Sequence, residues 1–220
     1  MGEHHESHAA IVAEEKDTGR LEAFSDGVFA FAITLLALDV KLKREAMPSS
    51  AALLEALRYA WPSYLVFISS FFSILIMWVH HHNLFRLVRR VDTPLLFANG
   101  FLLMMVTLVP FPTAVVADNL RTPAASVACA FYAGYSLFVS IAFYLLLLAA
   151  LRRPVCASSL TSEGLRRYRS HYRLGPPLYL VAMLLAPLSP WLTMGICTAL
   201  WVFWAAMTRM AASTAELSVR

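Results

Sequence analysis

The sequence predicts an all-α integral membrane protein with six transmembrane helices. Of its 220 residues, 59% are hydrophobic and only 15% are charged, and the mean hydropathy is positive. This composition is typical of chains that reside in a bilayer and excludes an ordinary soluble domain. Six apolar stretches reach or approach the roughly 20 residues that are needed to cross the hydrocarbon core. They lie at about 22–40, 61–79, 94–117, 126–151, 174–189 and 191–210.

Proline positions predict where these helices bend and turn. Pro110 and Pro112 lie within the third stretch and predict a kink toward its far end. The fifth stretch is short and is joined to the sixth only by Ser189 and Pro190. We therefore expect a tight hairpin shaped by Pro187 and Pro190. The two halves of the chain show no convincing internal repeat.

The six helices are predicted to form one transmembrane domain over residues 20–211, with a tail at each end. Residues 1–19 lack a basic start, an apolar core and a small-residue cleavage site, so they are expected to form a mobile cytosolic tail rather than a cleaved signal peptide. Residues 212–220 form the second predicted tail. Three widely separated cysteines indicate neither a disulfide framework nor a metal site.

Basic residues predict the orientation of the helices. With both termini in the cytoplasm, thirteen of the eighteen Lys and Arg residues lie on the inner side. The five on the outer side are Lys41, Lys43, Arg44, Arg58 and Arg121. The net charge of +4 then favours contact with the anionic inner leaflet of the lipid bilayer. No nucleic-acid-binding module is present, so nucleic acid is not an expected partner.

Several polar residues are predicted to lie at a similar depth near the inner ends of three helices. They are Arg20, Ser25 and Asp26 in the first helix, His81 and His82 in the second and Asn99 in the third. An unpartnered carboxylate at this depth costs several kcal/mol, so Asp26 needs partners. We expect it to accept hydrogen bonds from the imidazole and amide groups and to lock the helices together.

The histidines and the missing motifs argue against a metal centre and against an enzyme. Successive helical residues point about 100° apart, so His80, His81 and His82 cannot all face one metal ion. Structural hydrogen bonds are the favoured role for them. The chain has no HExxH motif, no GxSxG elbow and no phosphate-binding glycine loop. We therefore predict no metal, no cofactor and no catalytic residue.

A set of motifs in the first three helices is specific as a combination. It consists of Arg20 with Phe24-Ser25-Asp26-Gly27, then Trp78, His81-His82, Leu84-Phe85, Asn99 and Pro110-Phe111-Pro112. This set resembles the RxxxFSDG signature and the motifs after it in bacterial relatives of the lysosomal potassium channel, the transmembrane protein 175 family. The resemblance covers roughly half of the chain.

The resemblance implies a potassium-preferring cation channel with potassium ions as the permeant species. In that family, four copies of the first helix line a central pore in a homotetramer, and bulky apolar residues form its narrowest point. A single six-helix repeat implies a multi-pass protein of a prokaryotic plasma membrane. Phe24, Phe31, Leu35 and Leu38 fall on one stripe of the first helix by their spacing. By itself, this apolar stripe favours ordinary helix or lipid contact, and only the resemblance favours a pore.

Site residues follow from the resemblance by position. The first constriction residue lies five after the motif aspartate and is usually Ile or Leu, but here it is Phe31. The tightest ring is therefore expected at Phe31, Leu35 or Leu38. Thr34 matches the threonine layer of the family and is the candidate selectivity residue. Asp39 would give a ring of carboxylates at the outer pore entrance.

Two other kinds of function fit the sequence less well. A proton-coupled or other secondary transporter would use Asp26 and a histidine as a relay, and it would be expected to show repeats or broken helices. A purely structural membrane protein would need no lumen. Particle symmetry separates these readings, because a fourfold tetramer favours the channel and a monomer or dimer favours the others.

Overall fold

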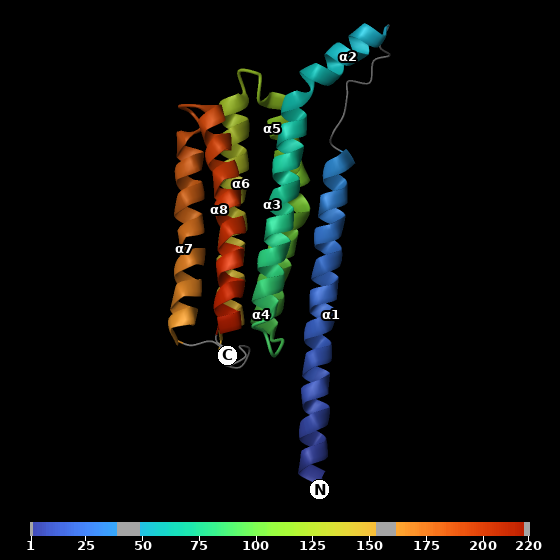
Figure 1. The fold of residues 1–220 in the computed structure, drawn as a ribbon, viewed down its shortest axis with the longest axis vertical. Coiled ribbons are helices and arrows are strands. Elements are labelled where there is room, and N and C mark those ends of the chain that lie inside the picture. Colours follow the sequence, from blue (N-terminus) through green and yellow to red (C-terminus); the bar gives the residue numbers. More distant parts are fainter. Residues whose placement is uncertain (1, 39–48, 153–161, 218–220) are drawn as a thin grey trace.

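The structure, a computed structural model, describes residues 2–38, 49–152 and 162–217, and it confirms the all-α prediction for these residues (Figure 1). Within these ranges the chain is helical apart from short connections. The helices are α1 (Gly2–Leu38), α2 (Ser50–Tyr59), α3 (Trp61–Phe85), α4 (Thr93–Leu108), α5 (Pro110–Asn119), α6 (Ala125–Ala150), α7 (Ser162–Leu185) and α8 (Pro190–Leu217).

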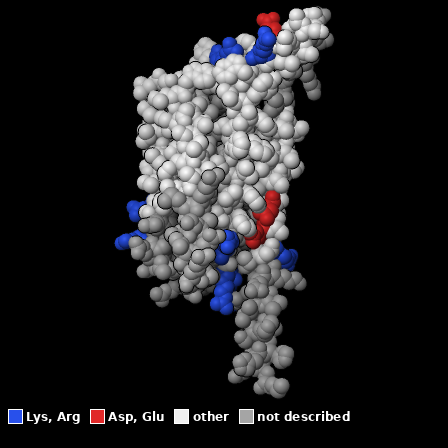
Figure 2. Space-filling model, viewed as in Figure 1, with Lys and Arg blue, Asp and Glu red and all other residues white. Residues whose placement is uncertain are grey.

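Five segments of the described chain are long and apolar enough to cross a membrane. They are Asp17–Leu38, Trp61–Phe85, Thr93–Asn119, Ala125–Ala150 and Pro190–Met207. In Figure 2, charged side chains gather toward the two ends of the molecule and leave a broad uncharged band between them. α7 has 24 residues, but its first half is rich in arginine and it is not among the five. A sixth span therefore stays a prediction.

Helices end or begin next to the prolines that the sequence analysis singled out. α4 ends at Leu108 and α5 begins at Pro110, because proline cannot supply the N–H that would continue the hydrogen-bond pattern. α7 ends at Leu185 and α8 begins at Pro190, so a four-residue turn joins them as a hairpin. The hairpin is thereby confirmed, and the helix is interrupted at Val109, next to the predicted kink.

The predicted tail boundaries do not coincide with helix ends. α1 is a single helix from Gly2 to Leu38 and therefore continues through the segment that we expected to be a mobile tail. α8 likewise continues past residue 211 to Leu217. Helical hydrogen bonding can extend beyond an apolar span, so the loss of hydrophobicity at residue 19 does not mark the end of the helix.

The helices form a bundle with α1 at one edge and α7 and α8 at the opposite edge (Figure 1). α1 packs on α3 and α4, while α6 packs on α7, α4, α5 and α8. α3 is the link between the two sides because it contacts both α1 and α8. Fully buried leucines and valines from α4 and α6 fill the interior, including Leu102, Val106, Leu146 and Leu147. The bundle thus leaves α1 covered on one side only.

The start of α4 is fixed by an aspartate that makes two contacts. Asp92 precedes the helix, and its Oδ1 accepts a hydrogen bond of 2.9 Å from the backbone N–H of Leu95. This is an N-cap, which satisfies a backbone donor that the helix leaves unpaired. The other carboxylate oxygen of Asp92 lies 3.4 Å from Nη1 of Arg152, just after α6. Asp92 therefore both begins α4 and ties it to α6.

Replacing Asp92 with alanine is expected to lower thermal stability. Loss of an N-cap costs about 0.5–2 kcal/mol, and the contact with Arg152 disappears with it. The melting temperature of the purified protein in detergent reports the change. Asp118→Ala is the matched control, because Asp118 is exposed near the end of α5. Equal melting temperatures for the two variants would contradict the capping role.

Candidate functional site

Three buried polar side chains connect α1, α3 and α4. Ser25 and His81 are completely buried, and Asn99 is 1% exposed. Nδ2 of Asn99 donates to Oγ of Ser25 at 3.0 Å, and the serine hydroxyl in turn donates to the carbonyl oxygen of Leu21 at 2.8 Å. Since the amide nitrogen of Asn99 is the donor, its Oδ1 accepts from Nε2 of His81 at 2.9 Å. The chain of donors and acceptors fixes which nitrogen of His81 carries hydrogen.

Aromatic rings enclose the remainder of the His81 side chain. Its ring stacks on Phe85 with a centroid separation of 4.2 Å and lies 5.3 Å from the ring of Phe29. Nδ1 of His81 is buried and makes no hydrogen bond. Within the described residues, no group of three His, Cys, Asp or Glu side chains is placed to hold a metal ion. His81 thus joins α3 to α4 through its hydrogen bond with Asn99.

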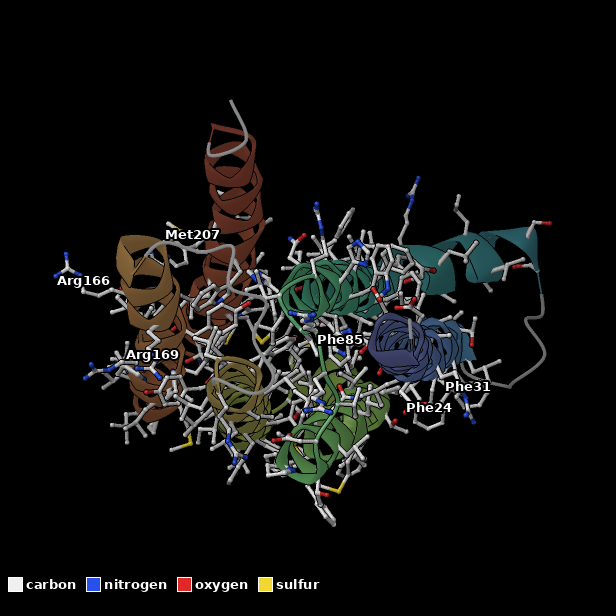
Figure 3. All side chains as sticks on the ribbon, turned by 90° about the horizontal axis from the view of Figure 1, so that it is seen from below. Phe24, Phe31, Phe85, Arg166, Arg169 and Met207 are labelled. Carbon is white, nitrogen blue, oxygen red and sulfur yellow. The ribbon has the colours of Figure 1, made fainter. Side chains whose placement is uncertain are left out.

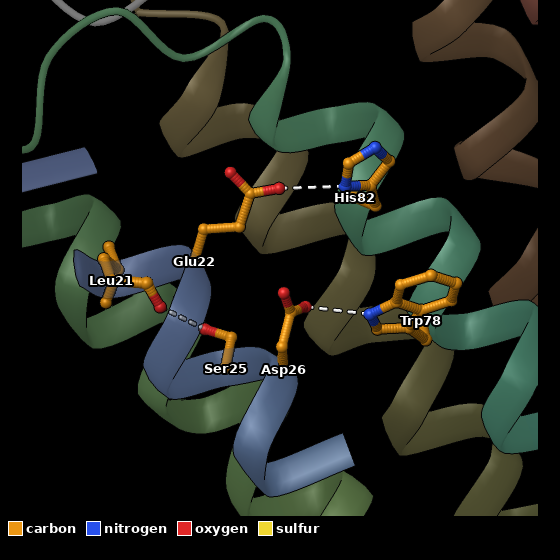
Figure 4. Close-up of polar contacts among 6 residues, drawn as sticks. All are labelled: Leu21, Glu22, Ser25, Asp26, Trp78 and His82. Carbon is orange, nitrogen blue, oxygen red and sulfur yellow. Dashed lines mark hydrogen bonds and ion pairs between the residues drawn. The ribbon is translucent and has the colours of Figure 1, made fainter. Parts of the chain in front are cut away.

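Two further contacts join α1 to α3 side by side (Figure 4). The indole Nε1 of Trp78 donates to Oδ1 of Asp26 at 2.8 Å. Nδ1 of His82 lies 2.9 Å from Oε1 of Glu22. Each helix contributes two residues four apart, which share one helix face. The antiparallel helices are therefore joined by two neighbouring polar contacts, Asp26–Trp78 and Glu22–His82, which we call the polar rungs.

The structure brings together most of the predicted polar residues, but it pairs them differently. Asp26 accepts from Trp78 rather than from a histidine or from Asn99. This follows from geometry, because Asp26 points toward α3 whereas Ser25, about 100° around the helix, points toward Asn99 in α4. Arg20 is exposed, and no hydrogen bond between described residues joins it to the network.

Sequence reasoning missed Glu22 as a partner. It precedes Asp26 by four residues, just as Trp78 precedes His82 by four. Matching spacings of polar residues on two antiparallel helices are a signal for paired contacts, and this signal was available in the sequence. A carboxylate near the membrane edge at position 22 also needs a partner for the same reason as Asp26.

The opposite face of α1 is apolar and uncovered. Phe24 and Leu38 are each 65% exposed, and Phe31 is 61% exposed. Figure 3 shows Phe24 and Phe31 on the side of α1 that points away from the other helices. Leu35 is only half-buried at the margin of this face. The stripe predicted from the sequence is thus open to a partner or to lipid in the single subunit.

Thr34 lies on this exposed face as well. Its hydroxyl donates to the carbonyl oxygen of Phe31 at 2.7 Å, which is the usual bond of a threonine within a helix. The oxygen lone pairs of Thr34 remain available to other groups on the exposed side. Asp39, the predicted entrance carboxylate, lies outside the described residues.

Asn99→Leu is expected to be strongly destabilising. The substitution keeps a similar volume but leaves Ser25 and His81 buried with one hydrogen bond fewer each. Each unsatisfied buried group costs about 1–3 kcal/mol, so the melting temperature should fall by several degrees. Asn119→Leu is the control, because the amide of Asn119 donates only to the carbonyl of Val115 within its own helix. A similarly small change in both variants would show that the three-helix network contributes little.

Comparison with known proteins places this chain in a family. Residues 20–110 match the family described as "Endosomal/lysosomal potassium channel TMEM175". A potassium channel of Chamaesiphon minutus is 46% identical over 193 residues, which cover 87% of this chain and 95% of that protein. The endosomal/lysosomal proton channel TMEM175 of Gallus gallus is 37% identical over 91 residues, which cover 39% of this chain and 18% of that protein.

A solved structure shares the fold. The crystal structure of a lysosomal potassium-selective channel TMEM175 homolog from Chamaesiphon minutus superposes with a TM-score of 0.79 at 44% identity. The match covers 88% of this chain and 98% of the other. The matched residues 20–110 include both polar rungs, the buried three-helix network and the exposed face of α1. This chain therefore belongs to the TMEM175 family of ion channels.

Proposed function

We propose that the protein is a potassium-preferring cation channel in which α1 of four identical subunits lines the pore. The observation that carries the proposal is the apolar face of α1, where Phe24, Phe31 and Leu38 are each more than 60% exposed although α1 packs into the bundle on its other side. The potassium preference is supported by the name of the Chamaesiphon minutus relative.

A homotetramer accounts for the open face. One helix cannot enclose a lumen, whereas side chains from four copies can form closed rings around an axis. In such an assembly Phe31, Leu35 and Leu38 form successive apolar rings. A narrow apolar constriction excludes water when it is closed and conducts when it widens enough to be wetted. A small outward movement of α1 is therefore sufficient for gating.

Polar residues on the same helix would act on the ion. Thr34 lies between the apolar rings, and its oxygen can replace part of the hydration shell of potassium. A ring of Asp39 side chains at the outer entrance would concentrate cations. No ring of backbone carbonyls is proposed, so the selectivity for potassium over sodium is expected to be modest.

The polar network would hold the inner end of the membrane-spanning part of α1, Asp17–Leu38, while the rest of that part moves. Ser25, Asp26 and Glu22 bind α3 and α4 within a little more than one helical turn. The exposed rings begin about one turn further along α1. An anchor at this end restricts the motion to a tilt about the network, which changes the pore radius mainly at Leu35 and Leu38.

We place both termini on the cytoplasmic side of a prokaryotic plasma membrane. The support is the excess of basic residues in segments at that side of the helices. Arg86, Arg89 and Arg90 follow the end of α3, and Arg152 follows the end of α6. The lipid headgroups facing these arginines would be the anionic ones of the inner leaflet.

Polar substitution at the proposed constriction is expected to increase ion flux. Phe31→Asn would let water enter the closed ring, so potassium flux into liposomes should rise several-fold and the preference over sodium should fall. Phe97→Asn is the matched control, since Phe97 is 77% exposed but lies on α4. The oligomeric state of each variant is measured in detergent. Unchanged flux and selectivity in intact Phe31→Asn tetramers would contradict the proposal that α1 lines the conduction path.

A proton-coupled secondary transporter is the second candidate, and it is favoured by the pairing of Glu22 with His82 and of Asp26 with Trp78 in this chain. A secondary transporter that couples protons through Asp26 needs a carboxylate that gains and loses a proton. Asp26→Asn keeps an oxygen that can accept from Trp78 but removes this titration.

The two candidates differ in what drives potassium movement. For the channel, we expect potassium flux to follow the potassium gradient at any pH gradient, and Asp26→Asn to keep flux while altering its magnitude. For a coupled transporter, a pH gradient alone would drive potassium uptake, and Asp26→Asn would abolish this uptake. Flux from liposomes with independently set potassium and proton gradients distinguishes them. Potassium accumulation driven by pH would contradict the channel proposal.

A further inference from the structure

One exposed stripe of α7 changes from apolar to basic along its length. Its members recur every three or four positions, which places them on one side of the helix. They are Pro177, Leu180 and Leu184 in the apolar part and Arg173, Arg169 and Arg166 in the basic part, and all six are exposed. Figure 3 shows Arg166 and Arg169 projecting away from the other helices. We call this stripe the outer face of α7.

Two contacts of α3 provide a scale of depth for α7. Trp61, at the start of α3, stacks on Trp191 of α8 with a centroid separation of 6.1 Å. Tryptophan is enriched where the membrane meets water, so this pair marks the outer boundary in the proposed orientation. From Trp61 to His80, α3 rises roughly 28 Å at 1.5 Å per residue. This rise is close to the thickness of the hydrocarbon core, about 30 Å, so His80 marks the inner boundary.

The change on α7 falls at this inner boundary. The hydroxyl of Tyr172 lies 3.1 Å from Nδ1 of His80, which places the neighbouring Arg173 near the same level. Arg169 and Arg166 lie one and two turns further toward the cytoplasmic side, where lipid headgroups begin. The apolar part of the outer face is therefore at the depth of the acyl chains, and the basic part is at the depth of the phosphates.

The arginines of the outer face have no carboxylate partner among the described side chains. α7 packs on α6 and α8. The sequence of α6 contains no acidic residue, and that of α8 contains only Glu216, near its end. Within α7 the one acidic residue is Glu163, in the first turn. The positive charges of the outer face are thus available to an anion from outside the subunit.

We propose that the outer face of α7 is a binding site for an anionic phospholipid of the inner leaflet. Arg169 and Arg173 are four residues apart and can hold one phosphate between them, since guanidinium groups bind phosphate oxygens through paired hydrogen bonds. One acyl chain of the same lipid lies along the apolar part of the stripe. The basic part selects an anionic headgroup over a neutral one by charge.

The position of α7 in the bundle favours lipid over a second subunit as the occupant. α7 lies at the edge opposite α1 (Figure 1). If α1 lines the central axis of a tetramer, α7 is on the periphery and faces the bilayer. This step rests on the proposed function, whereas the charge and depth of the outer face do not.

The first test measures how phosphatidylglycerol binding depends on the basic part of the stripe. Phosphatidylglycerol added to the purified protein in detergent should raise the melting temperature more than phosphatidylcholine does, because a ligand of the folded state stabilises it. Arg169→Gln with Arg173→Gln should weaken this lipid binding by roughly tenfold or more. The matched control is Arg86→Gln with Arg89→Gln, which removes two exposed arginines at the same end of the bundle. An equal loss in both double variants would mean diffuse attraction to charge and would overturn the proposal.

The second test uses the wild-type protein and does not depend on the folding of a variant. Native mass spectrometry from micelles with equal amounts of the two lipids should show phosphatidylglycerol retained in preference to phosphatidylcholine. Equal retention would overturn the proposal. Inorganic phosphate should not raise the melting temperature in phosphatidylcholine. A rise equal to that with phosphatidylglycerol would indicate a site for free anions and would also overturn it.

A structure of the assembly in a bilayer that contains phosphatidylglycerol separates this proposal from the channel proposal. Lipid density along the outer face of α7 is the expected result, and a second subunit packed there would overturn the lipid site. Because none of these measurements uses ion flux, failure of the lipid site leaves α1 as the proposed pore helix. Failure of the flux experiment on Phe31→Asn would leave the lipid binding measurements unchanged.

Discussion

A polar side chain buried among membrane helices is stable only if its hydrogen bonds are completed within the protein. The rest of the structure around α1 depends on how Asn99 meets this requirement. Its amide donates to Ser25 in α1 and accepts from His81 in α3, so both ends of one side chain are used. Removing any one of these residues leaves at least one of the others with a hydrogen bond fewer. The three helices are therefore fixed at one common depth by a single small network.

α3 links α1 to the helices at the opposite edge of the subunit, because it contacts both α1 and α8. Consecutive histidines on this helix point in different directions, and each finds a different partner helix. His81 bonds Asn99 in α4, His82 bonds Glu22 in α1, and His80 bonds Tyr172 in α7 and the backbone of α8. The run of histidines that could suggest a metal site is thus a three-way structural connection.

Sequence reasoning succeeded where one physical cause dominates. Proline positions predicted the break at Pro110 and the turn before Pro190, because proline removes a backbone donor regardless of tertiary context. Depth in the membrane placed Ser25 and Asn99 in one predicted network, and a hydrogen bond joins them in the structure. Depth does not determine the rotation of each helix, so it could not predict that Asp26 would bind Trp78. The length of α7 could not be predicted from the sequence either, because its arginine-rich first half carries no apolar signal.

The rotation of α1 connects the anchor to the proposed pore. Ser25, Phe29, Ala32 and Leu36 are buried and repeat every three or four residues along one face. Phe24 and Phe31 each precede a buried residue by one position and are exposed. A rotation of α1 by a single residue step, about 100°, would bury Phe31 and expose Phe29 or Ala32. The hydrogen bonds of Ser25 and Asp26 prevent this rotation, because each reaches a different neighbouring helix. The polar network thereby determines which side chains α1 presents to the central axis of the proposed tetramer.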